Sequence, residues 1–299
     1  MTLLELVERH AQQLESAGVA FGHGTDNAFD EAAWLVLWAL GLPLDTPLTV
    51  SPETSTVVRL VTAAEQDKVA DLIKTRIASR KPAAYLTREA WLQGVPFYVD
   101  ERAIVPRSFI AELLVQADTA ANIDPWLGEH TQRVLDLCTG NGSLAVLAAM
   151  AFPDVHVDGA DLSDDALAIA RINVDRHGLQ GRITLMKSDG LQHVRGPYDL
   201  ILCNPPYVNA NSMGALPQEY LAEPELALAG GVDGMDFIRD LLRDAPSNMA
   251  AHGVLILEIG NEREHFEAAF PLLEIFWLET SAGEDQVLLV TREALLNAH

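Results

Sequence analysis

Residues 198–207 read YDLILCNPPY, an apolar run that ends in Asn204-Pro205-Pro206-Tyr207. The apolar run predicts a buried parallel strand. Two prolines cannot continue the hydrogen-bond ladder of a sheet, so the strand has to stop at Asn204. The polar Asn204 and the aromatic Tyr207 are therefore left at the carboxyl end of the strand, where open α/β sheets bind their ligands.

These four residues suit one kind of ligand group. The Oδ1 atom of Asn204 and the carbonyl of Pro205 are two acceptors that together match a donor group with two hydrogens. A planar –NH2 group fits, and Tyr207 offers a face against which its plane can stack. Asn204, Pro205 and Tyr207 are thus candidate catalytic residues, and Pro206 joins them as a candidate substrate-binding residue. The alternative is a turn that only ends the strand, because Asn-Pro is common turn chemistry.

Strand and helix patterns alternate around this stretch, from residue 133 onward. The sequence predicts strands at 134–137, 155–160, 183–186, 200–203 and 254–259, and helices at 144–151, 165–177 and 236–249. This alternation is typical of a doubly wound, Rossmann-like parallel sheet of the α/β class. Two last strands, 274–279 and 286–290, are joined by residues 281–284 and predict a final antiparallel hairpin.

The first part of the chain has a different texture. Residues 1–80 have apolar positions at helical spacing and predict a small N-terminal helical domain, with Ser51-Pro52 as a helix start. Residues 81–107 predict a linker that holds a β-hairpin, with strands at 89–92 and 95–99 on either side of Gly94. A helix is predicted at 108–121, and residues 108–299 form the third segment. The helical domain either recognises the substrate or only supports its neighbour.

Composition narrows the class of protein. The 299 residues are 49% hydrophobic, and 43 acidic against 20 basic residues give a net charge of −23. Such a surface repels nucleic-acid backbones and favours basic partners, so we expect no sequence-specific nucleic-acid binding. Two cysteines make neither a disulfide framework nor a zinc site. The first ten residues have no basic n-region of a signal peptide, and no apolar run predicts a membrane span. We expect a cytoplasmic protein without a metal.

A second constellation predicts a nucleotide-type cofactor. Residues 136–142 read DLCTGNG, follow the first strand of the alternating region and open a helix. Glycines there let the backbone approach a ligand closely. Asp161 follows the second strand, where a carboxylate can accept both ribose hydroxyls, and Asp189 follows the third. The expected cofactor-binding residues are Asp136, Cys138, Thr139, Gly140, Asn141, Gly142, Asp161, Leu162, Asp189, Gly190 and Asn204.

The position of Asp136 favours one cofactor over another. A pyrophosphate avoids a carboxylate just ahead of the glycine turn, whereas an α-ammonium group is attracted to it, directly or through water. S-adenosylmethionine has adenosine at one end and an ammonium-bearing methionine at the other. Its demethylated product would be S-adenosylhomocysteine. The alternative role of Asp136, a buried carboxylate that ties down the turn, is compatible with this one.

The glycine turn, Asp161 and residues 204–207 together resemble the class I methyltransferases that act on planar amino groups. More narrowly, residues 82–86 (PAAYL), Glu223-Pro224 and residues 230–234 (GGVDG) resemble the protein glutamine methyltransferases. One branch of that family modifies translation release factors, and the other modifies a glutamine of a large-subunit ribosomal protein, L-three. Residues 97–102 (FYVDER), 105–108 (VPRS) and 216–220 (LPQEY) are similar to the ribosomal branch, because the release-factor branch usually has Arg-Pro at Arg107-Ser108. The resemblance covers nearly the whole chain and is weakest over the first 50 residues.

The resemblance implies an enzyme that methylates the side-chain amide of a glutamine in a basic ribosomal protein, with a helical domain that helps to select it. Four alternatives stay open at this point. A release factor is the other protein substrate. A nucleic-acid adenine methyltransferase would also bind a planar –NH2 group. A nicotinamide-dependent dehydrogenase would use the glycine turn but leaves residues 204–207 unexplained, and a non-catalytic module would bind the cofactor without turnover.

Overall fold

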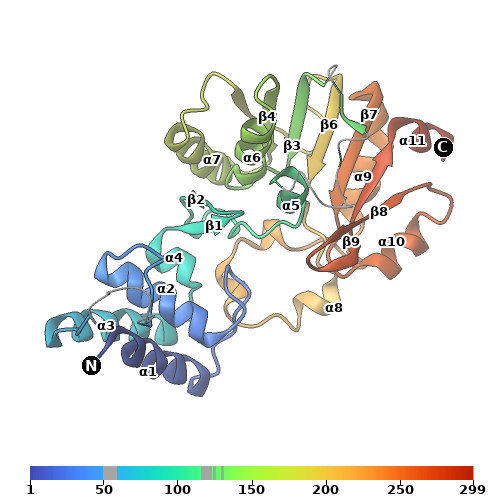
Figure 1. Cartoon of the computed structure of the whole chain (residues 1–299). Helices are drawn as coiled ribbons and strands as arrows, with labels where there is room; N and C mark the ends of the chain where they lie inside the picture. Colours follow the sequence, from blue (N-terminus) through green and yellow to red (C-terminus); the bar gives the residue numbers. More distant parts are fainter. Residues whose placement is uncertain (50–58, 116–122, 124–125, 129–130, 299) are drawn as a thin grey trace. The chain divides into compact units, whose positions relative to one another are not determined.

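The computed structural model describes residues 1–49, 59–115, 123, 126–128 and 131–298 (Figure 1). The chain divides into two compact units. Unit 1 consists of Met1–Ala90 and Leu216–Ala222, and unit 2 consists of Trp91–Ala215 and Glu223–His299. A short segment from the second half of the chain therefore belongs to the helical unit. The predicted helix start at Ser51-Pro52 and residues 116–121 of the predicted helix at 108–121 lie outside the described residues.

Unit 1 is built from short helices that begin and end where the sequence signals it. Its helices are α1 (Leu3–Ser16), α2 (Ala28–Leu40), α3 (Ala63–Ser79) and α4 (Ala83–Thr87). Thr2 and Thr62 each form a capping box with the glutamate three residues on, and Gly41 ends α2 with a φ of 66°. The helical character predicted for residues 1–80 is confirmed in the part that the structure describes, residues 1–49 and 59–80. Residues 83–87, which were placed in the linker, form the additional helix α4.

A buried arginine holds the inserted segment inside unit 1. The side chain of Arg76 is fully buried, and its Nε donates to Glu31 Oε1 at 2.8 Å. Its Nη1 donates to Glu219 Oε1 at 3.4 Å, and Arg80 Nη1 donates to the same oxygen at 3.1 Å. Since Glu219 lies within Leu216–Ala222, these ion pairs attach that segment to α3 and, through Arg76 and Glu31, to α2. Burial raises the pKa of Glu31, and the adjacent guanidinium opposes that shift.

Unit 2 contains the predicted sheet. It begins with a two-stranded sheet of β1 (Ala90–Leu92) and β2 (Val95–Phe97), as the hairpin signal indicated. Seven strands then pair in the order β5-β4-β3-β6-β7-β9-β8, with parallel pairing from β5 to β7 and antiparallel pairing of β9 with β7 and β8. The strands are β3 (Arg133–Leu137), β4 (His156–Asp161), β5 (Ile183–Lys187), β6 (Tyr198–Cys203), β7 (Met249–Glu258), β8 (Phe276–Thr280) and β9 (Gly283–Thr291).

Helices cover both faces of the sheet, as in a class I methyltransferase fold (Figure 1). Alternate residues of the strands point to opposite faces, so Val134 and Leu200 enter one apolar cluster and Leu135 and Ile201 enter the other. The first cluster includes residues of α5 (Ile110–Val115), α6 (Ser143–Ala151) and α7 (Asp164–Arg176). The second includes residues of α9 (Asp236–Asp244), α10 (Arg263–Ala269) and α11 (Arg292–Asn297).

Several predicted boundaries are wrong: β7 begins at Met249 and not at residue 254, and β9 begins at Gly283, inside the connection predicted at 281–284. The helix expected at 236–249 ends at Asp244, and Ala245–Ser247 form a 3-10 turn before β7 begins at Met249. Pro246 explains the difference because proline has no N–H to donate within a helix. Helices α10 and α11 and the short α8 (Ala210–Met213) were not predicted. Among the described residues, none of the helices is both long and apolar enough to cross a membrane.

Candidate active site

The glycine turn after β3 is anchored by the buried carboxylate of Asp136. Its Oδ2 accepts from Thr139 Oγ1 at 2.5 Å and from the backbone N–H of Ala145 at 2.9 Å. The turn-anchoring role that the sequence allowed is thus present. The Oδ1 atom of Asp136 and the Nδ2 atom of Asn141 are buried and have no hydrogen-bond partner in the described chain. Burial raises the pKa of Asp136 to about 7 against the two hydrogen bonds, which favour the ionised form.

Glycines are needed in this turn for two different reasons. Gly140 has a φ of 55° and Gly142 a φ of 80°, a left-handed backbone that disfavours side chains. A Cβ atom on Gly142 would also lie 3.0 Å from the Cβ of Ala170, so glycine lets α6 begin close to α7. Asn173 of α7 fixes the same turn, because its Nδ2 donates to the Asn141 carbonyl at 2.8 Å and to the Tyr98 carbonyl at 2.9 Å.

Asp161 lies directly beside the glycine turn. Its Oδ2 accepts from the Gly140 N–H at 2.9 Å, and its Oδ1 accepts from the Ser163 N–H at 2.8 Å. A carboxylate has about four lone-pair sites, so these bonds leave room for a ribose hydroxyl. Burial raises the pKa of Asp161. Two residues that the sequence singled out separately are therefore joined by a hydrogen bond, and Leu162 follows with an exposed side chain.

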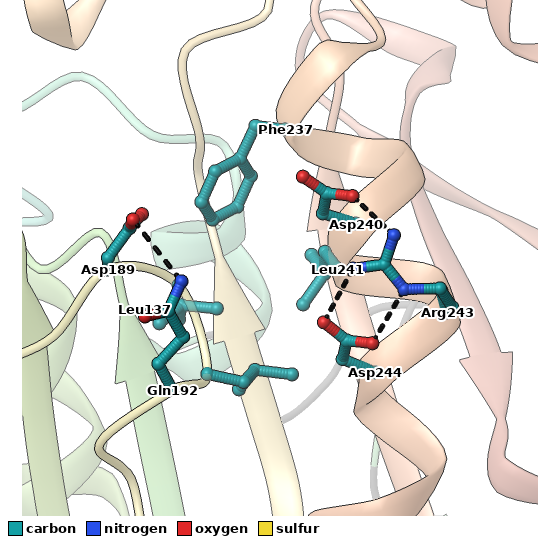
Figure 2. A pocket seen from close by; sticks show the side chains of 10 residues that line it. Leu137, Asp189, Gln192, Phe237, Asp240, Leu241, Arg243 and Asp244 are labelled. Carbon is teal, nitrogen blue, oxygen red and sulfur yellow. Dashed lines mark hydrogen bonds and ion pairs between the residues drawn. The ribbon is translucent and has the colours of Figure 1, made fainter.

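Asp189 and Gly190 line a hollow beside the sheet. The hollow has a volume of about 110 Å³ and lies between the loop after β5 and helix α9. Figure 2 shows Asp189 facing Phe237 across it, with Gln192 donating to Asp189 at 3.3 Å. Gly190 has a φ of 53°, and a Cβ atom there would lie 3.8 Å from the Phe237 ring. The predicted residues thus border a partly apolar space next to Leu137, the last residue of β3.

Asn204 follows β6 with its side chain available. The strand ends at Cys203, as two prolines require, and Asn204 is partly exposed while Pro205 is buried. The side-chain amide of Asn204 forms no hydrogen bond within the part of the chain that the structure describes. Leu137 pairs with Cys203 in the parallel register, so Cys138 and Asn204 leave neighbouring strands side by side. The glycine turn and residues 204–207 therefore share one edge of the sheet.

The two cysteines meet at this edge. Cys138 has a φ of 61°, and its side chain packs in the same apolar cluster as Cys203. A hydrogen bond with Cys203, together with burial, raises the pKa of the Cys138 thiol. The thiolate, which is the reactive form, is therefore disfavoured at neutral pH.

A glycine-rich loop encloses the backbone of Tyr207. The Val208 N–H donates to the Leu228 carbonyl at 2.9 Å, and the Gly230 N–H donates to the Val208 carbonyl at 2.9 Å. A Cβ atom on Gly230 would lie 2.7 Å from the Cα of Tyr207, and one on Gly234 would overlap the Tyr207 carbonyl oxygen. The GGVDG segment, which the sequence marked only by resemblance, thus has a physical role, because it packs against residues 207–208 where no side chain fits.

The sequence did not predict the partners of several carboxylates that connect distant segments of the site. Glu223 accepts two bonds of 2.6 Å from the Arg107 guanidinium and one of 2.9 Å from the Val105 N–H, so the VPRS and Glu223-Pro224 segments meet. Glu262 accepts from Asn209 Nδ2 at 2.7 Å. Glu258 accepts from the Tyr207 hydroxyl at 3.4 Å. Glu223 stood in a quoted segment, but its partner is 116 residues away, and no local pattern indicates such a pair.

The predicted site residues come together as one group. Residues 136–142, 161–162, 189–190 and 204–207 lie at or just beyond the carboxyl ends of β3, β4, β5 and β6, which are neighbours in the sheet, and Asp136 and Asp161 are still within their strands. Carboxylates, backbone N–H groups and a side-chain amide line this edge. Within the described residues, no cluster of three or more His, Cys, Asp or Glu side chains is placed to hold a metal ion.

Comparison with known proteins adds independent findings. The methyltransferase small domain family model matches residues 115–232. A ribosomal protein uL3 glutamine methyltransferase from Bordetella pertussis is 52% identical over 98% of this chain and 96% of its own length. Proteins of the same name from Burkholderia pseudomallei and Neisseria gonorrhoeae are 51% and 47% identical, over 97% and 99% of this chain and 94% and 96% of their own. Among solved structures, a methyltransferase from Pyrococcus furiosus is similar over 76% of this chain and 98% of its own, with a TM-score of 0.48 and 16% identity.

Proposed function

The chain belongs to the ribosomal protein uL3 glutamine methyltransferases, and we propose that it methylates the side-chain amide nitrogen of a glutamine in ribosomal protein uL3 with S-adenosylmethionine. The observation that carries the proposal is the available amide of Asn204 at the carboxyl end of β6, beside the turn that Asp161 binds. An acceptor for the substrate and a nucleotide-type cradle thus lie on the same sheet edge.

The residues around the glycine turn fit the cofactor. The unpartnered Asp136 Oδ1 and Asn141 Nδ2 are buried polar atoms next to the turn, and buried polar groups normally have a partner. Asp161 retains lone pairs for the ribose hydroxyls, and Asp189 with Phe237 borders a hollow for an aromatic group. Cys138, Thr139, Gly140, Gly142, Leu162, Gly190 and Asn204 complete the proposed contacts. S-adenosylmethionine supplies an electrophilic methyl group when bound.

The substrate amide needs orientation more than deprotonation. An amide nitrogen is a poor nucleophile because its lone pair is delocalised into the carbonyl. Asn204 Oδ1 and the Pro205 carbonyl accept its two N–H bonds and direct the lone pair towards the methyl group. These hydrogen bonds strengthen as positive charge develops on nitrogen, so they stabilise the transition state more than the ground state. Tyr207 packs on the plane of the amide, with Pro206 beside it, and the proton leaves to water after transfer.

The partner is a basic protein that meets a strongly acidic enzyme. The net charge of −23 favours such a partner through long-range attraction. In this proposal, the cytoplasm is the compartment, residues 1–80 help to select the substrate, residues 81–107 connect, and residues 108–299 carry out the transfer. The reaction requires no metal ion.

The test is transfer of a labelled methyl group from S-adenosylmethionine to purified uL3, followed by peptide mass spectrometry. We expect one glutamine of uL3 to gain the mass of one methyl group. A release factor and an adenine-containing oligonucleotide are assayed in parallel. Label on either of these and none on uL3 would replace the proposed substrate. Binding of S-adenosylmethionine without transfer to any of them would indicate a non-catalytic module.

A further inference from the structure

The last residue of β7 and the four residues after it, 258–262, face residues 207–209 at alternate positions. Glu258, the last residue of β7, contacts the Tyr207 hydroxyl at 3.4 Å. A Cβ atom on Gly260 would lie 2.5 Å from Cε2 of the Tyr207 ring. Glu262 accepts from the Asn209 side chain at 2.7 Å. Residues 258–262 therefore pack against Tyr207 and Asn209 of the candidate active site.

Glu258 is a fully enclosed carboxylate with a distinct set of donors. Its side chain is 2% exposed. Oε2 accepts from Ser108 Oγ at 2.6 Å and from the backbone N–H groups of Phe109 at 2.9 Å and Ile110 at 3.4 Å. These three donors fix Oε2, and the other oxygen, Oε1, is the one that faces Tyr207. The carboxylate thus spans the distance between the start of α5 and the tyrosine hydroxyl.

The hydroxyl contact is long for an O–H···O hydrogen bond, whose usual length is about 2.7–2.8 Å. Active-site hydrogen bonds are often long without substrate and tighten in the complex. The close approach of Gly260 to the ring is a second contact, which leaves no room for a side chain at position 260. Both contacts come from one segment, so the orientation of the Tyr207 ring depends on where β7 ends.

We propose that Glu258 is a positioning residue that sets the orientation of the Tyr207 ring through its hydroxyl, and so aligns the substrate amide held by Asn204 and Pro205. The inference rests on the proposed function for the role of Tyr207. In this proposal Glu258 acts through Tyr207 and is not assigned a contact of its own with substrate or cofactor. Its function is to link the ring to Ser108 and the start of α5. This link depends on the length of the Glu258 side chain and not on its negative charge.

Two substitutions distinguish the effect of the length of the Glu258 side chain from the effect of its charge. Glu258→Gln keeps the length, because its oxygen accepts the three donors at α5 and its –NH2 group donates to the Tyr207 hydroxyl. Glu258→Asp keeps the charge but is one methylene shorter and cannot reach both ends. We expect kcat for methylation of uL3 to stay within about twofold of wild type in Glu258→Gln and to fall roughly threefold to tenfold in Glu258→Asp, the loss of one hydrogen bond. The Kd for S-adenosylmethionine should be unchanged in both.

The same measurements in a Tyr207→Phe background test whether Glu258 acts through the tyrosine. We expect Tyr207→Phe to lower kcat by a similar factor, and Glu258→Asp to cause no further loss in that background, because interacting residues show non-additive effects. If the losses of kcat from Glu258→Asp and Tyr207→Phe multiply in the double variant, the proposal is wrong. It is also wrong if Glu258→Gln is impaired while Glu258→Asp is active. An unchanged kcat in Tyr207→Phe would also overturn the proposal, even if Glu258→Asp fails to fold.

A readout without catalysis keeps this inference separate from the proposed function. The chain has five tyrosines, and ring-labelled tyrosine gives an NMR signal for Tyr207 that the Phe variant assigns. Glu258→Asp should shift or broaden that signal, and Glu258→Gln should leave it near the wild-type position. An unmoved signal in Glu258→Asp would refute the positioning role even if wild type does not methylate uL3. Absence of wild-type transfer alone would refute only the proposed function.

Discussion

Two buried carboxylates of the helical unit, Glu31 and Glu219, are compensated differently from two of the methyltransferase unit, Asp136 and Glu258. In the helical unit, Glu31 and Glu219 contact the fully buried guanidinium of Arg76. In the methyltransferase unit, Asp136 and Glu258 accept from hydroxyl and backbone N–H groups. Burial raises the pKa of both Asp136 and Glu258 to about 7.

The difference indicates different roles for the two kinds of carboxylate. A guanidinium against carboxylates is a charged cross-link, and here it attaches Leu216–Ala222 to the helices. Asp136 and Glu258 are held by neutral donors near the ends of their strands, so their orientation does not depend on an ion pair. Shifted pKa values are common at functional sites, and they also occur in groups that have only a structural role. Substitutions in the two units test this contrast, beginning with the largest expected effect.

Removing the buried cation should be the most damaging change. Arg76→Met leaves Glu31 and Glu219 buried without their guanidinium, which typically costs about 3–5 kcal/mol of unfolding free energy. The control is Arg243→Met, because Arg243 pairs with Asp240 and Asp244 on the surface and is 60% exposed. Exposed pairs contribute about 0–1 kcal/mol. Urea denaturation of both variants measures the difference, and similar losses would mean that the buried pair does not hold the unit together.

Removing the proposed substrate acceptor, Asn204, should affect turnover and not stability. Asn204→Ala keeps the backbone fixed by two prolines and deletes one acceptor, so kcat on uL3 should fall by roughly 100–1,000-fold, as for other preorganised contacts. Calorimetry should show nearly unchanged binding of S-adenosylmethionine. Asn211→Ala, on the exposed helix α8, is the matched control. Asn204 also borders the proposed cofactor site, and a cofactor affinity that falls in step with activity would mean that Asn204 serves mainly the cofactor and not the substrate amide.

Removing the carboxylate beside the glycine turn should weaken the cofactor. Asp161→Ala deletes charged acceptors for the ribose hydroxyls, and hydrogen bonds to charged groups contribute about 1.5–3 kcal/mol. Affinity for S-adenosylmethionine should therefore fall by roughly tenfold to a hundredfold. Asp164→Ala is the control, since Asp164 is 74% exposed and pairs with Lys187. Equal calorimetric affinity of the two variants would exclude Asp161 from the cofactor site.

The raised pKa values predict a stability that depends on pH. Unfolded carboxyl groups have pKa values of about 4, whereas burial raises the pKa of Glu258 to about 7 in the fold. The folded state thus binds more protons between these values, and its stability falls as pH rises through this window, by up to about 1.4 kcal/mol per pH unit. Glu258→Gln does not titrate, so its stability should fall less between about pH 5 and pH 7. Parallel urea midpoints for both proteins at these pH values would contradict the assignment.

The smallest effect concerns two glycines with similar backbones. Gly260 has a φ of 53° and Gly41 a φ of 66°, so alanine at either position should cost about 1–2 kcal/mol of stability. They differ in surroundings, because nothing lies within 4 Å of a Cβ on Gly41. Gly260→Ala should also displace the Tyr207 ring and lower kcat/KM by roughly threefold to tenfold, the range of an aromatic packing contact. Equal kinetics of the two variants would show that the ring tolerates displacement.

The sequence by itself determined the order of elements in unit 2 and the edge at which the site lies. Alternating strand and helix periods are local signals, and prolines such as Pro205 mark where a strand must stop, so Asp136, Asp161, Asp189 and Asn204 could be assigned to successive strand ends. The parallel order of those strands then brings them to one edge. The apolar pattern predicted a helix at 236–249, but the helix stops before Pro246, because proline has no N–H to donate within a helix.

Tertiary structure alone decided which distant groups meet. The bond from Tyr207 to Glu258 spans 51 residues, that from Arg107 to Glu223 spans 116, and that from Arg76 to Glu219 spans 143. A glutamate in a sequence carries no mark of its future partner, because a carboxylate suits a solvated surface as well as a buried cluster. The burial, the pKa and the hydrogen-bond donors of such a glutamate depend on which elements pack together, and the periodicity of the sequence does not predict that. The anchors of Tyr207 and of Leu216–Ala222 exist only once the chain has folded.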